Sequence, residues 1–381
     1  MKKFKVAIST MLISALLVSA TGCGGSSNDT AGGSSSDKIY IGTSFPLSGN
    51  IASEGEQLVN AIQLAIDQVN AEGGINGREV AIKSEDDEGD ATKAASIANK
   101  FGDDSSILGI IMSYNSACAL AQIPILESSE LVAVSPTAES PNLTGASDWF
   151  YRTCCSNAYS GVVCAELCQN IGLSNVAVLY QNDDYGQGLK DAFEDEAAKL
   201  GINIATEQTY VQAETVDFST QLTAISASGA DGIFIAGYTT EAGLICSQKN
   251  SYNCDNLKIV GGVSIYSDGI FEYEGTDGIY SLGGFSLDSQ DEKVKKFIAD
   301  YEGAYNSTPS SWSAYAYDAA MVMLEGMKNC GDNLNRESLK EAIKKIDYQG
   351  VTGKNVFVNG DVEKEYDWFM TENGKWTVIN K

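Results

Sequence analysis

Residues 39–74 have the sequence IYIGTSFPLSGNIASEGEQLVNAIQLAIDQVNAEGG, in which a short apolar run precedes a long segment of helical periodicity. The run at 39–42 is predicted to form a strand. Residues 53–71 are predicted to form a helix, because their apolar side chains recur mostly at helical spacing. Gly73 and Gly74 are predicted to end it, since glycine adopts the positive φ of a helix C-cap without strain.

The same alternation of strand and helix continues along the chain. Further strands are predicted at 80–83, 107–111, 131–134, 176–180, 202–210, 232–236 and 258–260, with an extended segment at 278–285. Helices are predicted at 91–101, 117–127, 162–171, 185–200, 218–228, 242–249, 292–305, 314–327 and 336–345. Short strands are predicted within 354–379. This order predicts an α/β fold with two runs of similar length, each a parallel sheet with helices on both faces. The later helices could return to the first run, and two consecutive domains are the alternative.

The composition restricts the chemistry. The 381 residues include no histidine, and 51 acidic residues outnumber 25 basic ones, for a net charge of −26. Histidine-dependent nucleophiles, a histidine general base and histidine-ligated metals are therefore excluded. The acidic excess disfavours nucleic acid as a partner. There is also no G-x-S-x-G nucleophile elbow, so we expect neither an enzyme nor a cofactor or metal site.

The N-terminus carries export signals. Residues 1–22 are predicted to be a signal peptide, with three early lysines and an apolar run at 6–20 that is shorter than a membrane span. The letters ATGC at 20–23 resemble a bacterial lipobox, which implies a lipid on Cys23; an ordinary signal cut near Ala20 is the alternative. The Gly/Ser-rich residues 23–37 are predicted to be a flexible linker. We expect an extracytoplasmic protein, periplasmic or lipid-anchored at the outer face of the bacterial cell membrane.

Eight further cysteines follow Cys23. An exported chain permits disulfides, and the sequence leaves open whether Cys246 pairs with Cys254. Cys164 and Cys168 are expected on one helix face. Without a second cysteine pair or a histidine, they do not indicate zinc. Most of the eight are predicted to be buried thiols.

Eight short motifs, each weak alone, occur together in one order. They are PLSG at 46–49, GGINGR at 73–78, DD at 86–87, SPTAESP at 135–141, RT at 152–153, DDYGQG at 183–188, FS at 218–219 and YDAA at 317–320. Through them the body of the chain resembles the Leu/Ile/Val-binding family, the substrate-binding proteins of branched-chain amino acid ABC importers. The resemblance implies the periplasmic binding protein type I fold.

The resemblance also implies a division into lobes. It places residues 38–155 with 286–350 in lobe 1, and residues 156–285 with 351–381 in lobe 2. Three crossing strands are expected to join the lobes, near 152–158, 280–285 and 351–357.

Ligand-binding residues follow from the resemblance position by position. Ser116 corresponds to a serine that holds the ligand carboxylate at a helix start, with Ala117 beside it; a plain N-cap is the alternative for Ser116. Thr137 and Ala138 correspond to a loop whose backbone faces the ligand. Glu139 stands where many relatives have threonine or serine.

The second lobe is expected to supply aromatic walls. Tyr185 and Tyr238 match tyrosines that close over the ligand, although both could be ordinary half-buried side chains. Asn157 stands at the first crossing. Val263 replaces an acid that relatives pair with the ligand ammonium, whereas Glu54 adds an acid elsewhere. The ligand is therefore expected to be an amino acid in another pose, a more cationic compound or a small amide.

The implied mechanism is a hinged clamp. Ligand bound between the lobes favours closure, and the closed monomer delivers it to a membrane permease of an ABC importer, near which the lipid keeps it. The alternative is a ligand-sensing subunit for a signalling partner. Because no histidine is present, ligand binding is expected to change little between about pH 6 and 8.

Overall fold

The computed structural model describes residues 38–212 and 214–379. The predicted signal peptide, the lipidation site at Cys23 and the predicted linker lie outside the described residues. Within the described residues, no helix combines the length and apolar character needed to cross a bilayer. The same residues contain no grouping of acidic and cysteine side chains suited to holding a metal ion.

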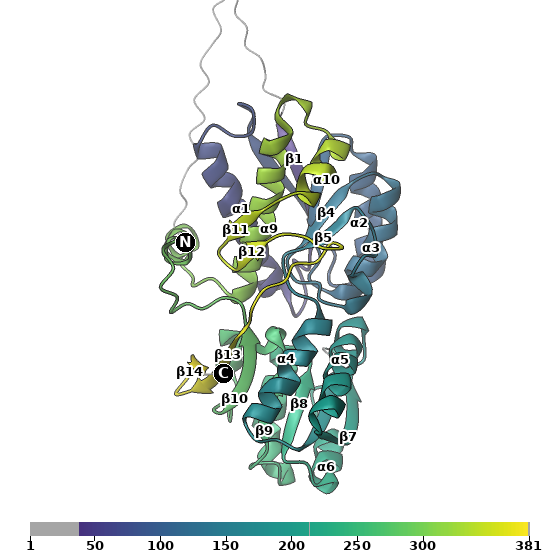
Figure 1. Cartoon of the computed structure of the whole chain (residues 1–381), viewed down its shortest axis with the longest axis vertical. Coiled ribbons are helices and arrows are strands. Elements are labelled where there is room, and N and C mark those ends of the chain that lie inside the picture. Colours follow the sequence, from purple (N-terminus) through teal and green to yellow (C-terminus); the bar gives the residue numbers. More distant parts are fainter. Residues whose placement is uncertain (1–37, 213, 380–381) are drawn as a thin grey trace, which may run out of the picture. The chain divides into compact units, whose positions relative to one another are not determined.

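The first lobe is built on a five-stranded, fully parallel sheet of order β2-β1-β3-β4-β5 (Figure 1). Its strands are β1 (Ile39–Phe45), β2 (Val80–Asp86), β3 (Ile107–Met112), β4 (Val132–Ser135) and β5 (Phe150–Arg152). Its helices are α1 (Ala52–Ala71), α2 (Ala91–Asp103), α3 (Ser116–Ser128), α8 (Glu292–Tyr305), α9 (Ser311–Cys330) and α10 (Arg336–Lys344). The last three come from the C-terminal half of the chain; α8 and α9 pack against α1, and α10 packs against α9.

The second lobe is built on a seven-stranded sheet of order β14-β13-β10-β9-β8-β6-β7. Its strands are β6 (Asn175–Gln181), β7 (Asn203–Tyr210), β8 (Gly232–Ala236), β9 (Lys258–Gly261), β10 (Ile279–Gly283), β13 (Asp367–Glu372) and β14 (Lys375–Ile379). Its helices are α4 (Asn157–Asn170), α5 (Asp184–Leu200), α6 (Ser219–Ser228) and α7 (Thr239–Lys249). Among the described strands of this sheet, the β10–β13 and β13–β14 pairs are antiparallel and the other pairs are parallel. The predicted α/β fold with two lobes is confirmed.

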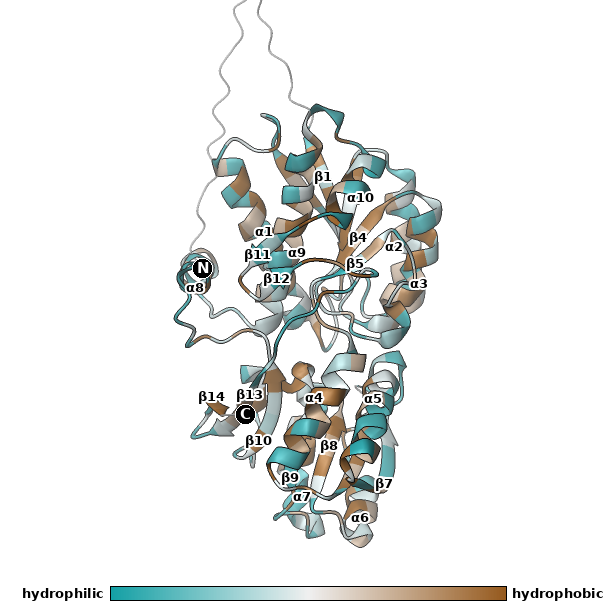
Figure 2. Cartoon of the chain, viewed as in Figure 1, coloured by the Kyte–Doolittle hydropathy of each residue, from teal (hydrophilic) through white to brown (hydrophobic). Residues whose placement is uncertain are grey.

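Strand alternation places the apolar side chains in layers on both faces of each sheet. In β3, Ile111 packs with α1 and α9, whereas Ile110 packs with α2 and α3. In β6, Val178 belongs to the core under α4 and α5, whereas Leu179 belongs to the core under α6 and α7. Successive strand residues point to opposite faces, so strands such as β8 are hydrophobic throughout (Figure 2).

Local signals set the helix ends. α1 ends at Ala71, and Gly73 and Gly74 follow with φ of 107° and 73°, as predicted. A Cβ at Gly74 would lie 2.0 Å from the Arg78 carbonyl oxygen, so no larger residue fits there. α4 begins at Asn157, five residues before the predicted start at residue 162. Its first turn is polar, so apolar spacing does not predict it. The Ser156 hydroxyl caps the helix.

Three connections join the lobes. The chain leaves β5 at Arg152 and begins α4 at Asn157, and it leaves β10 at Gly283 and begins α8 at Glu292. The third connection runs from the small hairpin β11 (Tyr348–Gly350) and β12 (Gly353–Asn355) to β13. These segments overlap the three predicted crossings.

The third connection starts later than the predicted return to lobe 2 at residue 351. The buried Asp318 carboxylate on α9 accepts hydrogen bonds from the backbone N–H groups of Val351 (2.8 Å) and Thr352 (2.9 Å). These bonds hold residues 351–355 on the first lobe. The Lys364 ammonium donates to the Thr352 hydroxyl at 2.6 Å, so even Lys364 lies beside this hairpin.

The eight cysteines of the described body are free thiols, and seven of them are buried. Cys246 and Cys254 are both buried and carry no disulfide in this structure. Cys164 and Cys168 lie on the buried face of α4, as their spacing predicts. The thiols act as small apolar groups within the cores.

Candidate functional site

A cavity of about 580 Å³, which we name the main cavity, is lined by residues of both lobes. From the first lobe it receives the start of α1, Tyr114 after β3, and the start of α9. From the second lobe it receives the start of α7, the loop after β7, and residues 264–273. These segments follow the carboxyl ends of parallel strands or begin helices, which is where ligands bind in α/β folds.

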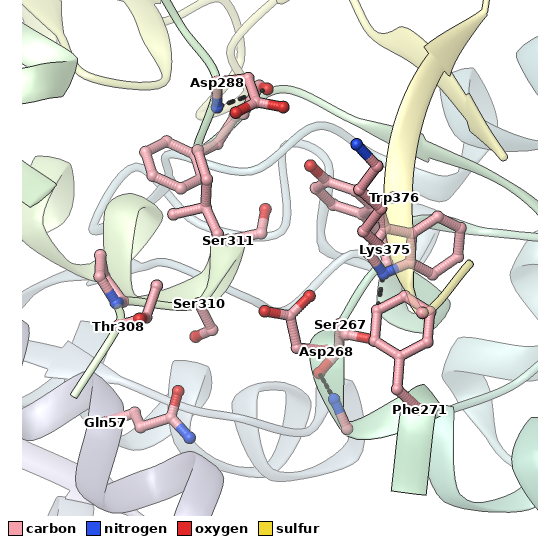
Figure 3. A pocket seen from close by; sticks show the side chains of 17 residues that line it. Gln57, Ser267, Asp268, Phe271, Asp288, Thr308, Ser310, Ser311, Lys375 and Trp376 are labelled. Carbon is pink, nitrogen blue, oxygen red and sulfur yellow. Dashed lines mark hydrogen bonds between the residues drawn. The ribbon is translucent and has the colours of Figure 1, made fainter. Parts of the chain in front are cut away.

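A second cavity of about 420 Å³, the side cavity, shares Gln57, Ser267, Gly269 and Ser310 with the main cavity. Figure 3 shows Asp268 pointing into it, between the α1 side chain of Gln57 and the first turn of α9. The Trp376 indole N–H donates to the Ser267 carbonyl oxygen at 3.1 Å. This bond joins β14 to a loop that lines both cavities.

Three helices begin at the main cavity or next to it without a side-chain cap. The N-cap residues are Ile51 of α1, Asn115 of α3 and Tyr238 of α7, and none of them caps its helix through its side chain. In contrast, α9 starts with a capping box formed by Ser310 and Ser313. Uncapped helix starts present free N–H groups and the positive end of the helix dipole. They are suited to receive an anionic group of a ligand.

Acidic side chains dominate the ionisable groups of the main cavity. Glu54, Glu241 and Glu272 line it, and no lysine or arginine is among the described lining residues. Burial raises the pKa of Glu54, and the nearby charge of Glu272 raises it further. Since Glu54 belongs to α1 and Glu272 to the second lobe, two like charges interact from opposite lobes.

The aromatic walls are formed by residues of both lobes. Tyr114 of the first lobe stacks with Tyr238 of the second, with ring centroids 6.0 Å apart and an interplanar angle of 26°. Tyr185 stacks on Tyr238 at 4.8 Å. Tyr238 lines the main cavity, whereas Tyr185 is 2% exposed and is not among its lining residues. Tyr114 is a wall residue that the sequence did not point out.

The predicted first-lobe residues form a bonded inner layer. The Ser116 hydroxyl accepts from the Ser140 N–H at 3.1 Å, and the Thr137 hydroxyl donates to the Ser113 carbonyl oxygen at 2.6 Å. Ala138 is fully buried, and Ala117, next to Ser116 in α3, is partly buried. None of these predicted residues lines the main cavity in this structure.

Glu139 and Asn157 meet where the first crossing begins. The Asn157 N–H donates to the Glu139 carbonyl oxygen at 2.7 Å, and the Asn157 side-chain amide donates to the Tyr185 carbonyl oxygen at 3.2 Å. Three of the predicted site residues, from both lobes, are therefore in contact. Val263, which replaces the acid expected from the resemblance, is 2% exposed and packs in the apolar core.

The carboxyl group of Glu139 is fully buried. Burial raises its pKa to about 8, against a smaller lowering by the Arg152 charge. The Ser264 side chain interacts with both Glu139 and Tyr185 and lowers the pKa of each, although neither carboxylate oxygen of Glu139 has a described partner in good hydrogen-bond geometry. The Tyr185 and Tyr315 hydroxyls and Asn157 Oδ1 also lack described partners. Buried polar atoms of this kind are costly unless another group satisfies them.

Arg152 fixes the loop that carries Glu139. Its guanidinium is buried and donates to the carbonyl oxygens of Ala138 (3.1 Å) and Ser140 (2.9 Å). It also pairs with Asp361 on the third connection, at 2.6 and 3.0 Å. One side chain therefore ties the first crossing, the site loop and the third connection together.

Several lining residues were not predicted, namely Tyr114, Glu241, Glu272 and Trp312. Glu241 had a usable signal, because it lies just past the predicted strand at 232–236, where ligands of parallel sheets bind. Glu272 and Trp312 had none, since they come near the cavity only through the packing of η4 (Asp268–Glu272) and α9.

Known proteins resemble this chain along nearly its whole described length. A family model described as periplasmic binding protein matches residues 38–374. Leu/Ile/Val-binding protein homolog 2 of Brucella abortus is 27% identical over 366 residues, covering 92% of this chain and 95% of that protein. The leucine binding protein LivK of Thermotoga maritima has a TM-score of 0.83 at 27% identity, covering 90% of this chain and 98% of that one.

A second solved structure carries a ligand. LivJ of Streptococcus pneumoniae, a branched-chain amino acid transporter substrate binding protein in complex with isoleucine, has a TM-score of 0.82 at 26% identity. The alignment covers 90% of this chain and 99% of that one.

Proposed function

Because the chain belongs to the periplasmic binding protein family, a family of extracytoplasmic solute-binding proteins, we propose that it captures a small amino acid or related compound and delivers it to the permease of an ABC importer. The similar protein LivJ is described as a transporter substrate binding protein, which supports import over sensing. The work assigned to the chain is binding and release, without a chemical step.

The observation that carries this proposal is the main cavity, to which both lobes contribute side chains. A ligand that contacts both lobes is bound most strongly when they approach each other, so binding favours the closed form. The stacking of Tyr114 on Tyr238 is one contact that depends on this approach. The connections after β5, β10 and β12 are the segments in which the hinge rotation would occur.

The groups around the cavity suit the two ends of an amino acid. The uncapped starts of α1, α3 and α7 would hold a carboxylate. The glutamates would accept hydrogen bonds from an ammonium. Of the predicted site residues, Tyr238 lines the cavity and would contact the ligand directly. The residues behind the lining that would support this pose are Ser116, Ala117, Thr137, Ala138, Glu139, Asn157 and Tyr185.

Titration calorimetry of the purified protein tests the capture of such a compound. The titrants are the standard amino acids with their amides and decarboxylated amines, so that each charged end is removed in turn. We expect saturable one-to-one binding of at least one compound. If none of them produces binding heat or raises the melting temperature, the proposed function is wrong.

The proposal includes anchoring through a lipid on Cys23, after removal of residues 1–22. The support is the lipobox-like sequence at 20–23 and the glycine- and serine-rich residues that follow. Cys23→Ser is expected to move the protein from the membrane to the soluble fraction, because a noncovalent contact would not replace the acyl chains. Cys330→Ser, which leaves Cys23 in place, is the control. Retention of Cys23→Ser in the membrane fraction would contradict the anchor.

A further inference from the structure

The charges in the main cavity are more negative than a zwitterion requires. Glu54, Glu241 and Glu272 line it, and its described lining residues include no cationic side chain. The neighbouring side cavity adds Asp268 and Asp288 against one lysine, Lys375. A ligand with one ammonium and one carboxylate would not offset the charges of both Glu54 and Glu272.

Two of these acids lie on opposite lobes, so repulsion between their charges affects closure of the lobes. Glu54 is held by α1 in the first lobe and Glu272 by η4 in the second, and their charges interact. Closure of the lobes brings such like charges closer and is opposed by their repulsion. A cation placed between them turns this repulsion into attraction to the ligand from both lobes.

The uncharged part of the lining includes four aromatic side chains among mostly polar ones. Tyr114, Tyr238, Tyr273 and Trp312 line the same cavity as the glutamates. Aromatic rings attract organic cations through their quadrupoles, most strongly where water is excluded. Acids and aromatic rings together form the surroundings that an ammonium or guanidinium group needs.

Glu139 is an independent indication of a cation. Its carboxyl group is completely buried, and neither oxygen has a described partner in good hydrogen-bond geometry. Its side chain interacts with Ser264, which lines the main cavity, whereas Glu139 itself lies behind the lining. The nearest cation, Arg152, uses its guanidinium on backbone carbonyls, Thr144 and Asp361. The unused acceptors of Glu139 therefore call for N–H donors from another molecule.

We propose that the cavity takes an organic cation, a ligand that carries more ammonium or guanidinium groups than carboxylates, with Glu54, Glu272 and Glu139 as its counter-charges. This inference rests on the proposed function, because it names the class of compound that the same cavity captures. A dibasic amino acid, its amide and a diamine all belong to this class.

Two matched pairs of probes isolate the extra positive charge. Lysine and norleucine share a linear side chain and differ by the terminal ammonium, and leucinamide differs from leucine by the loss of the carboxylate charge. We expect the cationic member of at least one pair to bind at least tenfold tighter by calorimetry at pH 7. Equal or tighter binding of norleucine and leucine would overturn the cation inference and leave the proposed capture of amino acids standing. If none of the four probes binds, the cation inference is overturned, and the full titration panel decides the proposed function.

Substitutions on one helix test the role assigned to Glu54. Glu54→Gln is expected to reduce the preference for the cationic probe several-fold, whereas Glu56→Gln, two residues along α1 and outside the lining, leaves it unchanged. Glu272→Gln should act like Glu54→Gln, and melting curves verify that each variant is folded. If both cavity variants keep the wild-type preference, these acids are not the counter-charges and the inference fails.

Discussion

Arg152→Met is expected to lower the free energy of unfolding by about 3–5 kcal/mol, the usual cost of breaking a buried ion pair on one side. The substitution leaves the carboxylate of Asp361 and the carbonyl oxygens of Ala138 and Ser140 without their donor. Because these groups lie on the site loop and the third connection, ligand affinity should fall as well. Urea unfolding and calorimetry measure the two effects.

Two controls distinguish the loss of the Arg152 hydrogen bonds from the loss of its positive charge. Arg152→Lys keeps the positive charge but cannot reach all the acceptors at once, so it should recover only part of the loss. Lys354→Met removes an exposed ion pair with Asp347 and is expected to cost no more than about 1 kcal/mol. If Arg152→Met costs as little as Lys354→Met, the buried guanidinium does not hold the connections together.

The ligand-free protein is expected to lose stability as the pH rises from about 4.5 to about 8. Burial raises the pKa of Glu139 from 4.5 to about 8, so the folded protein binds a proton at Glu139 that the unfolded chain releases. The stability due to this protonated state is complete below the unfolded pKa and is lost as the pH rises through the folded one. The shift is worth on the order of 4 kcal/mol across this range.

Glu139→Gln should remove this dependence, because the amide does not ionise. Melting temperatures between pH 5 and 8 are expected to fall less steeply for Glu139→Gln than for the wild type. Glu127→Gln, at an exposed position on α3, is the control and should follow the wild-type slope. Parallel slopes for the wild type and Glu139→Gln would show that Glu139 is ionised in the folded protein throughout.

Glu139 also changes the expected pH dependence of ligand binding, which the lack of histidine had predicted to be small. The ionisable groups whose charges interact with Glu139 are Tyr114, Arg152, Cys154, Cys155, Cys164, Tyr185, Tyr238, Tyr315 and Tyr366. Burial raises the pKa of every tyrosine and cysteine among them, which leaves Arg152 as the charged group near pH 7. A cationic ligand must therefore deprotonate Glu139, and its affinity should increase between pH 6 and 8.

The alternation of apolar runs was enough to predict the architecture. Parallel strands in α/β lobes are buried on both faces, so β3 and β8 appear as continuous apolar segments, and Gly74 and Gly201 end their helices through positive φ. The polar first turn of α4 and the three-residue strand β5 carry no periodic signal. Apolar spacing therefore predicts neither of them.

Two positions that the family resemblance pointed out, Glu54 and Tyr238, line the main cavity. Tyr238 lies two residues after β8, and Glu54 lies in the first turn of α1. Glu272 and Trp312 are placed by tertiary packing, which no local pattern records. The burial of Glu139 also depends on tertiary contacts, because Arg152 donates hydrogen bonds to the carbonyl oxygens of the residues on either side of Glu139.

Small-angle X-ray scattering of the protein, with and without the tightest ligand found by titration, tests most directly whether the lobes close on a captured compound. A clamp with hinges in the three connections is expected to become more compact, with a lower radius of gyration at saturating ligand than in its absence. Superimposable scattering curves under conditions in which calorimetry shows full occupancy would contradict capture by closure.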